Sequence, residues 1–400
     1  MTASPQHRDV LIVGAGIAGL ALAAALSAKG VQVSVLEAGP RPIVPDEGVS
    51  LNDWDLRVSA LTPTSIRLLE QLGVWSLLQA VRVGPYEHMH VWDADGTGDI
   101  TFKATDIGVP ALGYIVENRL TIEALLRVVE PLRGVEIIWN DPVSSLTRDL
   151  NDYPLITTEA GSQFCAPLLV GADGARSRLR ELAEFEVRRW SYHQSAIVGT
   201  VALASSHRQT CYQAFTPDGP LALLPLAKDN DCALVWSLDD GVWERLLALS
   251  DGDFVAALNR ALGGQAPEIT AIGERAAFPL NQCHAVDYIQ PRIALVADAA
   301  HSIHPLAGQG INLGLADVQV LAEEIDRALK EGLDWGEISV LRRYQRRRKT
   351  ENLAMMAAME GFKRGFGSQH PLLRVARNFG LSWVDRAGPI KHWLAQQALG

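Results

Sequence analysis

The sequence predicts an α/β protein in which a parallel sheet flanked by helices is interleaved with a smaller sheet-based domain and followed by C-terminal helices. Three observations predict this arrangement. An apolar strand, turn, helix and strand follow one another in residues 9–37, and short alternating apolar runs occur within residues 87–102 and 194–236. A further apolar strand at 292–297 precedes a helical pattern at 313–330. A strand, helix and strand in this order usually form parallel pairs.

The composition excludes several classes of protein. The 400 residues are 48% hydrophobic and 20% charged with a formal net charge of -10, which fits an enzyme and argues against nucleic-acid binding. The cysteines are too far apart to predict a disulfide framework or a metal site. The first residues lack the pattern of a signal peptide, so we expect a cytoplasmic location.

The first forty residues contain one complete βαβ unit. We expect a strand at 9–13, a turn at 14–19, a helix at 20–29 and a second strand at 31–37. Residues 10–28 carry no charge and approach the length of a membrane span, but the glycines inside this stretch favour a buried strand and helix. Residues 40–54 are expected to form a loop, and residues 62–78 one helix.

The turn of this unit contains Gly14, Gly16 and Gly19 in the spacing G-x-G-x-x-G. Such glycines let the backbone approach a pyrophosphate at the positive end of a helix. Glu37 ends the second strand, at the distance expected of a carboxylate that binds the ribose hydroxyls of an adenosine. The pattern therefore predicts a Rossmann-like dinucleotide-binding domain, with a purely structural glycine turn as the alternative.

Two later segments resemble the paired fingerprints of the aromatic-ring flavin hydroxylases. They are Gly-Ala-Asp-Gly at 171–174, and Ala-Asp-Ala-Ala-His at 297–301 together with His-Pro-Leu-Ala-Gly-Gln-Gly-Ile-Asn-Leu-Gly at 304–314. The sequence of the last segment is similar to that of the ubiquinone-biosynthesis hydroxylases in particular. The sequences of residues 57–61, 115–118 and 215–220 are similar to that family as well. One departure is Ala297, where the family usually has glycine.

The resemblance implies that the protein binds FAD non-covalently and that NAD(P)H visits only transiently. It implies flavin-binding roles for Arg57, Asp173, Asp298, Gly308, Gly310 and Asn312, in addition to the residues of the first βαβ unit. Asp298 would accept from ribityl hydroxyls, and the helix beginning near Ile311 would present its positive end to reduced flavin. Two alternatives stay open: Arg57 in a surface salt bridge, and Asp173 bonded within its own turn. His301 and His304 are not assigned as a catalytic base, and no catalytic residue is assigned.

The resemblance also implies the reaction. We expect O2-dependent hydroxylation of a polyprenylated phenol or benzoquinol, most consistent with C5 of 2-polyprenylphenol. The alternatives are a flavoprotein acting on another aromatic or isoprenoid substrate and a flavin-loaded scaffold without turnover. We expect homo-oligomers, contacts with other ubiquinone-biosynthesis proteins and peripheral contact with the inner face of the membrane.

The expected domains are discontinuous. Residues 1–84, 105–182 and 280–345 are assigned to the FAD-binding domain, 85–104 and 183–279 to the substrate domain, and 346–400 to a C-terminal helical segment. The basic run at residues 342–349 is expected to be a solvated helix face, with anionic lipid as the alternative. Met355, Met356, Met359 and Phe362 recur at helical spacing, which favours core packing over contact with a substrate or partner.

The segment from His370 onward lies beyond every flavin motif, and it carries Leu372, Val375, Ala376 and Phe379 on one helical face. This face suits a membrane interface or a partner, with packing on the enzyme's own core as the alternative. In the first case, truncation after Gln369 is expected to leave FAD content and Tm near wild type while abolishing quinone production in cells. Unfolding or loss of flavin would support core packing, and full quinone synthesis would exclude an essential role.

Overall fold

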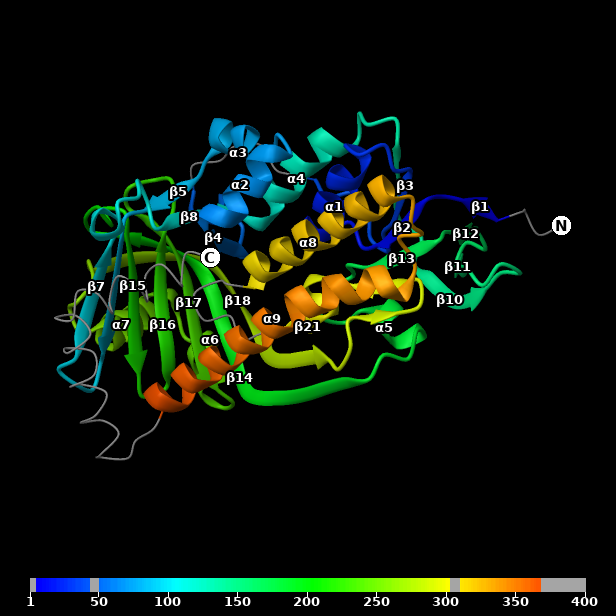
Figure 1. Ribbon diagram of the computed structural model, residues 1–400. Helices are drawn as coiled ribbons and strands as arrows, with labels where there is room; N and C mark the ends of the chain where they lie inside the picture. Colours follow the sequence, from blue (N-terminus) through cyan, green and yellow to red (C-terminus); the bar gives the residue numbers. More distant parts are fainter. Residues whose placement is uncertain (1–4, 44–49, 303–309, 368–400) are drawn as a thin grey trace.

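The computed structural model describes residues 5–43, 50–302 and 310–367. Figure 1 shows a helix-covered parallel sheet at one end and a large, mostly antiparallel sheet at the other. This confirms the α/β class predicted from the sequence. The described part includes no helix long and apolar enough to cross a membrane.

The parallel sheet has six strands in the order β19-β20-β13-β2-β3-β9. Their bounds are Ile289–Gln290 (β19), Ile293–Leu295 (β20), Leu168–Gly171 (β13), Val10–Val13 (β2), Val33–Leu36 (β3) and Val135–Ile138 (β9). Every pair is parallel except β19 with β20. From β2 the chain passes first to β3 and β9, and only later returns to β13 on the other side of β2. The strand order therefore reverses between β2 and β13.

Helix α1 (Ile17–Ser27) connects β2 to β3 and is buried over most of its surface. It packs against α4 (Asn118–Val129) and α8 (Gly310–Glu331). A helix that is apolar on all sides must be covered on all sides. The uncharged stretch at 10–28 is thus a core strand followed by a core helix, as the sequence predicted.

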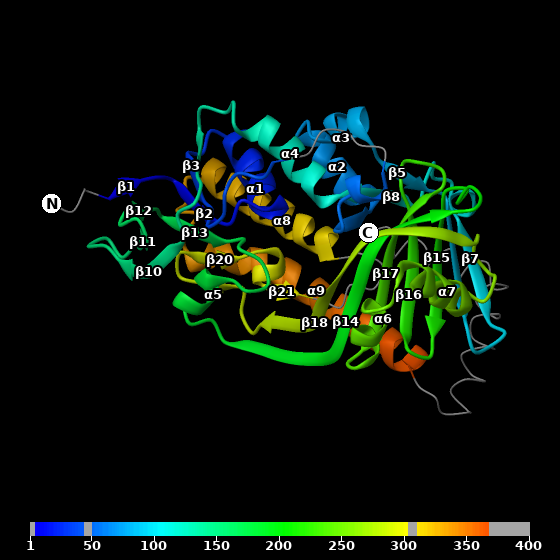
Figure 2. The same cartoon turned by 180° about the vertical axis from the view of Figure 1, so that it is seen from behind.

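The large sheet has the order β21-β18-β14-β17-β16-β15-β6-β7. The bounds are His301–Ser302 (β21), Ile269–Ala285 (β18), Val187–Leu203 (β14), Asp231–Asp239 (β17), Gly219–Pro225 (β16), Thr210–Thr216 (β15), His88–Asp93 (β6) and Asp99–Lys103 (β7). Helices α6 (Val242–Leu247) and α7 (Asp251–Leu262) cover one face, where Phe254 packs with Ile197 and Trp236. Figure 2 shows β14 and β18 continuing from this sheet back towards the parallel sheet.

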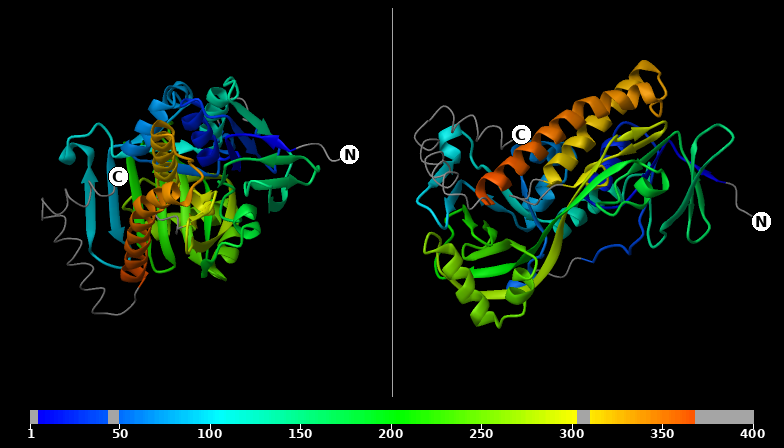
Figure 3. Two further views of the ribbon diagram at one scale, coloured as in Figure 1. Left: turned by 45° about the vertical axis from the view of Figure 1, so that its right-hand side comes forward. Right: turned by 90° about the horizontal axis from the view of Figure 1, so that it is seen from below.

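Smaller elements complete the molecule. One sheet contains β1 (Gln6–His7), β12 (Gln163–Cys165), β11 (Pro154–Thr158) and β10 (Val143–Arg148), and another contains β4 (Val58–Leu61), β8 (Gly113–Glu117) and β5 (Gly84–Tyr86). The remaining helices are α2 (Pro63–Gln71), α3 (Trp75–Val81), α5 (Arg178–Leu182) and α9 (Ile338–Gly367), with short 3-10 turns η1 (Leu51–Asp53), η2 (Ala104–Ile107) and η3 (Ala297–Ala299). Figure 3 shows α8 and α9 side by side, running in opposite directions.

The single helix expected over residues 62–78 is wrong. The structure has α2 and α3 in its place, separated at Gly73, whose φ of 74° lies in the left-handed region. Glycine adopts this conformation at little cost and commonly ends helices. The apolar spacing continues across the break because both helices bury residues against one core, including Leu69 and Leu78.

The domain boundaries stay a prediction. Strands β14 and β18 pair from Leu203 and Ile269 through to Val187 and Ala285, and the register shifts between the pairs Ser195–Pro279 and Ser191–Asn281, next to the expected boundary at residue 280. The segment at 370–400 lies outside the described residues, as do the side chains of Met359 and Phe362. Met356 is buried and Met355 is half-buried, so this part of the methionine stripe packs inward.

Candidate active site

Four of the residues singled out in the sequence follow the carboxyl ends of neighbouring parallel strands. Gly14 follows β2, Glu37 follows β3, Asp173 lies just after β13, and Asp298 lies just after β20. They therefore meet at one edge of the sheet, beside the reversal between β2 and β13. Such a reversal opens the crevice in which sheets of this kind bind ligands.

The first and third glycines of the motif are required for packing. Gly14 has φ of 107°, and a Cβ there would lie 2.5 Å from the carbonyl oxygen of Ala172. A Cβ on Gly19 would lie 1.9 Å from the carbonyl oxygen of Gly14. These two glycines bring α1, the turn after β2 and the loop after β13 into direct contact.

Gly16 is different, because a Cβ at this position would meet no atom within 4 Å. It is the N-cap of α1, with extended φ and ψ, no side-chain cap and no acidic residue in the first turn. The positive end of α1 is thus free to accept an anion from the open side.

Glu37 lies next to this turn. Its Oε2 accepts from the backbone N–H of Ala15 at 2.7 Å, and its Oε1 accepts from that of Gly39 at 2.8 Å. A carboxylate has about four acceptor positions, so both oxygens retain capacity for ribose hydroxyls. Ribose binding by Glu37 stays a prediction.

Asp173 bonds within its own loop. Its Oδ2 accepts from the backbone N–H of Leu179 at 3.0 Å, and its Oδ1 accepts from the Ser177 hydroxyl. Burial raises the pKa of Asp173, although these two hydrogen bonds oppose the rise. These two bonds lie within the loop that follows β13, and a flavin-binding role for Asp173 stays a prediction.

Asp298 lies in η3 and is half-buried. Burial raises the pKa of Asp298, and the neighbouring His301 and Arg57 charges act against that rise. No hydrogen bond to its carboxylate comes from residues 5–43, 50–302 or 310–367. This is the arrangement of an acceptor that still has a donor to find.

The preceding Ala297 has φ of 53°, a left-handed conformation that costs an alanine about 1 kcal/mol more than a glycine. The methyl group of Ala297 lies against Gly314, where an added Cβ would be 2.7 Å from that of Ala297. Gly314 leaves the space that Ala297 occupies.

Arg57 is exposed and directly precedes β4. Its charge reaches Asp298, and its guanidinium forms no ion pair with another described residue. Among residues 5–43, 50–302 and 310–367 the surface salt bridge is therefore absent, and a flavin-binding role for Arg57 stays a prediction. The adjacent Leu56 packs into a small apolar cluster on the large sheet, formed by Ala196, Val198 and Leu280 with Tyr192 and Val235.

Gly310 and Asn312 lie at the start of α8. A Cβ on Gly310 would meet nothing within 4 Å, whereas Gly308 and His304 lie outside the described residues. Asn312 is buried, and its Oδ1 accepts from the backbone N–H of Thr62 and the Ser65 hydroxyl while its Nδ2 donates to the Ala60 carbonyl. These contacts fasten α8 to β4 and α2, so direct flavin contact by this side chain stays a prediction.

Sequence reasoning missed Asp317 of α8, which is fully buried. Its oxygens accept from Ala297 N at 3.0 Å, His301 Nε2 at 2.6 Å, Arg348 Nε at 2.7 Å and Asn352 Nδ2 at 3.2 Å. Burial alone would raise the pKa of Asp317, but His301 and Arg348 together lower it. The sequence contained one signal that could have identified Asp317: it is a single carboxylate on the apolar face of a predicted helix, one turn after Gly314.

The basic run differs from the expected solvated face. Arg348 is buried against Asp317, Arg347 pairs with Glu323 and Glu324 of α8, and Lys349 pairs with Asp287. Only part of the run, including Arg342 and Arg346, is exposed. Most of these charges stabilise the contacts of α9 with the rest of the enzyme.

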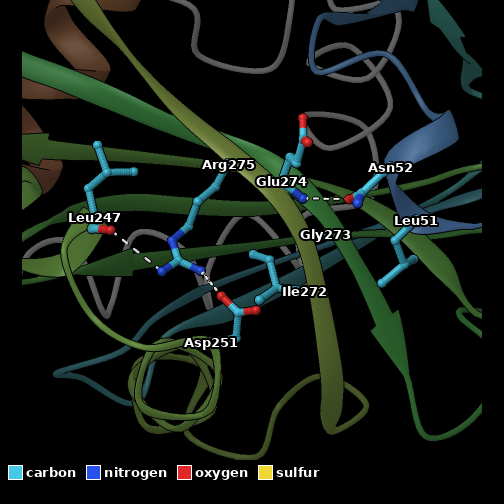
Figure 4. Close-up of a pocket in the computed structure, with 8 residues that line it drawn as sticks. All are labelled: Leu51, Asn52, Leu247, Asp251, Ile272, Gly273, Glu274 and Arg275. Atoms are coloured by element: carbon cyan, nitrogen blue, oxygen red, sulfur yellow. Dashed lines mark hydrogen bonds and ion pairs between the residues drawn. The ribbon is translucent and has the colours of Figure 1, made fainter.

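A hollow on the large sheet lies apart from this site (Figure 4). Its lining includes Asn52, whose Oδ1 accepts from the backbone N–H of Glu274. Arg275 lies in it with its guanidinium donating to Asp251 at 2.7 Å. Arg275 is already paired with Asp251, and none of the predicted cofactor-binding residues line the hollow. We therefore assign no cofactor to it.

Comparison with known proteins agrees with this geometry. Residues 7–358 match the family described as FAD binding domain. The chain is 38% identical to the 3-demethoxyubiquinol 3-hydroxylase of Escherichia coli, covering 99% of each chain, and 32% identical to the ubiquinone biosynthesis monooxygenase COQ6 of Homo sapiens, covering 96% of this chain and 90% of that one. The chain belongs to the FAD-dependent hydroxylases of ubiquinone biosynthesis. Membership of this family makes it an NAD(P)H- and FAD-dependent aromatic-ring monooxygenase.

Solved structures share the fold. PqsL of Pseudomonas aeruginosa, a probable FAD-dependent monooxygenase, aligns with a TM-score of 0.78 and 23% identity over 94% of this chain and 100% of that one. The p-nitrophenol 4-monooxygenase PnpA of Pseudomonas putida aligns with a TM-score of 0.79 and 20% identity over 98% of each chain.

The described residues fit FAD. The open space at Gly16, the uncapped positive end of α1 and the carboxylate of Asp298, which accepts no hydrogen bond from the described residues, match a pyrophosphate anion and a polyhydroxyl chain. We propose that the cofactor lies along this edge, with Gly14, Gly16, Gly19 and Glu37 at its adenosine half and Asp298, Arg57 and Gly310 at its flavin half.

Replacing Gly16 with valine tests the pyrophosphate position. The backbone at Gly16 is extended, so valine causes no strain, but its side chain would fill the open space. We expect the folded Gly16→Val protein to lose most of its bound flavin, measured by absorbance after purification. Gly252→Val on α7, another glycine with open space around it, is the control and should keep its flavin. Full flavin content in Gly16→Val would contradict the assignment.

The two loop aspartates are expected to differ. Asp298→Ala should weaken flavin affinity more than Asp173→Ala, because the Asp298 carboxylate has no donor from the described chain whereas Asp173 is already bonded to Ser177 and Leu179. Asp173→Ala should mainly lower the free energy of unfolding, by about 1–3 kcal/mol, and Tm should fall with it. Titration of the apoproteins with FAD gives the ranking, and equal dissociation constants would overturn it.

Proposed function

We propose that this protein hydroxylates the aromatic ring of a polyprenylated phenol or benzoquinol in ubiquinone biosynthesis, at C5 of 2-polyprenylphenol. The position of Leu56 supports a substrate site next to the proposed cofactor site. Leu56 packs with the apolar cluster on the large sheet, while the charge of the next residue, Arg57, acts to lower the pKa of Asp298 against the effect of burial. A buried apolar cluster thus lies next to a residue that acts electrostatically on the proposed flavin edge.

The apolar cluster is suited to contact with a lipophilic aromatic ring. Ala196, Val198 and Leu280 are buried, and Tyr192 contributes a hydroxyl that contacts Gln282. Sites for small molecules are typically lined by apolar side chains with a few polar groups that set orientation. We therefore place the aromatic head group between this cluster and the carboxyl edge of the parallel sheet.

When bound, FAD supplies the redox chemistry: it takes two electrons from NAD(P)H and activates O2 for transfer of one oxygen atom to the ring. The protein holds the ring in position and keeps water away from it. His301 is unsuited to proton transfer with the substrate, because it is buried and its Nε2 donates to the Asp317 carboxylate. No catalytic base is proposed.

The ring carbon has a second candidate. The Escherichia coli relative is named for 3-hydroxylation of 3-demethoxyubiquinol, and the chain is 38% identical to it. The sequence resemblance favours C5 and the name of this relative favours the other position. The remaining alternatives are another aromatic or isoprenoid substrate, and a flavin-loaded scaffold. Contacts with other ubiquinone-biosynthesis proteins, homo-oligomers and peripheral membrane contact are part of the proposal.

Quinone profiling of a deletion strain distinguishes these functions. We expect the strain to accumulate a polyprenylphenol that lacks the C5 oxygen. Accumulation of 3-demethoxyubiquinone would assign the other ring carbon, and normal ubiquinone would contradict the proposed pathway. With purified protein, a lipophilic phenol should accelerate NAD(P)H oxidation and give an O2-dependent hydroxylated product. A scaffold would give neither, and a reductase would not need O2.

Leu56→Ser tests the substrate position. Loss of an apolar contact is expected to raise KM for a lipophilic phenol by about tenfold, with flavin content unchanged. Leu150→Ser is the matched control, since Leu150 is fully exposed on a loop. An unchanged KM in flavin-loaded Leu56→Ser would contradict the proposed position.

A further inference from the structure

The carboxylate of Asp317 has every acceptor position in use. Oδ2 accepts from Ala297 N and His301 Nε2, and Oδ1 accepts from Arg348 Nε and Asn352 Nδ2. The donors come from η3, β21 and α9, while Asp317 itself belongs to α8. One side chain therefore joins four elements of the chain.

Two of these donors fix the backbone around Asp298. Ala297 directly precedes Asp298 and holds a left-handed φ of 53°, while His301 lies three residues further along. The Ala297 N–H and the His301 ring are bound to the same oxygen of Asp317, so η3 is held at both ends. Because the Asp298 carboxylate has no hydrogen bond from the described residues, its direction depends on this backbone.

The other two donors come from the C-terminal helix. Arg348 is only 4% exposed and also donates to Asn352 Oδ1 at 2.8 Å. A buried carboxylate is costly unless it is paired and fully hydrogen-bonded. Arg348 and Asn352 meet this requirement on the side of Asp317 that faces away from η3.

We propose that Asp317 is the positioning residue that holds Asp298 in its cofactor-binding orientation, and that Arg348 and Asn352 of α9 hold Asp317 in turn. This rests on the proposed role of Asp298 in binding FAD. The competing explanation is that Asp317 only fastens α8 to α9 and affects the cofactor through general stability.

Asp317→Asn is a sharp substitution for this purpose. The asparagine amide has one oxygen and one NH2 group, so the NH2 must face either the Ala297 and His301 donors or the Arg348 and Asn352 donors. One side of the arrangement is broken with almost no change of volume.

A double-mutant cycle on the holoprotein separates the two explanations. The rate of flavin release after dilution is followed by flavin fluorescence for wild type, Asp298→Ala, Asp317→Asn and the double variant. We expect Asp317→Asn to speed release by about tenfold in the wild-type background and to add little in the Asp298→Ala background. Equal factors in both backgrounds would overturn the positioning role while leaving Asp298 as a ligand. No effect of Asp298→Ala alone would overturn both that ligand assignment and the positioning role.

A control and a second variant complete the experiment. Asp334→Asn breaks the ion pair with Arg292 at the amino end of β20, away from Asp298, and should leave flavin release unchanged in both backgrounds. If Asp317→Asn does not fold, the same cycle is run with Arg348→Lys, which keeps the charge but cannot reproduce the planar set of donors. Coupling to Asp298→Ala supports the proposal, and independence of it overturns the proposal.

Discussion

The arrangement of the site depends on the close approach of Gly14 to the backbone of Ala172. With a Cβ at residue 14, the turn after β2 and the loop after β13 would have to separate, because the added atom would lie 2.5 Å from a carbonyl oxygen. Their contact lies where β2 and β13 pair, at the point where the strand order reverses. It brings a segment near the start of the chain against one from its middle, and so sets the edge along which Glu37, Asp173 and Asp298 are spaced.

Much of this edge could be predicted from the sequence because each residue directly follows an apolar strand. In a parallel sheet that position alone determines the edge at which a side chain emerges, so no long-range information was needed for Gly14, Glu37 or Asp298. Glycine was also an informative residue type at position 14, because the backbone there has a positive φ, which glycine adopts at little cost. The helix break at Gly73 was missed because an apolar repeat reports a buried face and does not report whether the backbone is continuous.

The arrangement beneath the edge could not be predicted in this way. Asp317 and Arg348 belong to different helices, and nothing in their spacing indicates that one lies against the other. A run of cations has the same appearance whether it faces water or neighbouring acids, and here the acids Glu323 and Glu324 lie on α8. The contacts of Asn312 with Ala60 and Thr62 are equally long-range, so a residue matched by motif proved to bind protein with both ends of its amide.

The paired strands β14 and β18 have a consequence for exchanging substrate specificity between relatives. Each strand is a 17-residue element of the large sheet, and one end of each lies beside the parallel sheet. A chimera that takes the large sheet from a different hydroxylase must therefore cut both strands, and at cross-strand partners such as Ser195 and Pro279, or the spliced ladder changes register. Because a shift of one residue moves every side chain to the opposite face, Ala196 and Leu280 would leave the apolar surface next to Leu56. Recombination between members of the family is thus constrained to cut the two strands at paired positions.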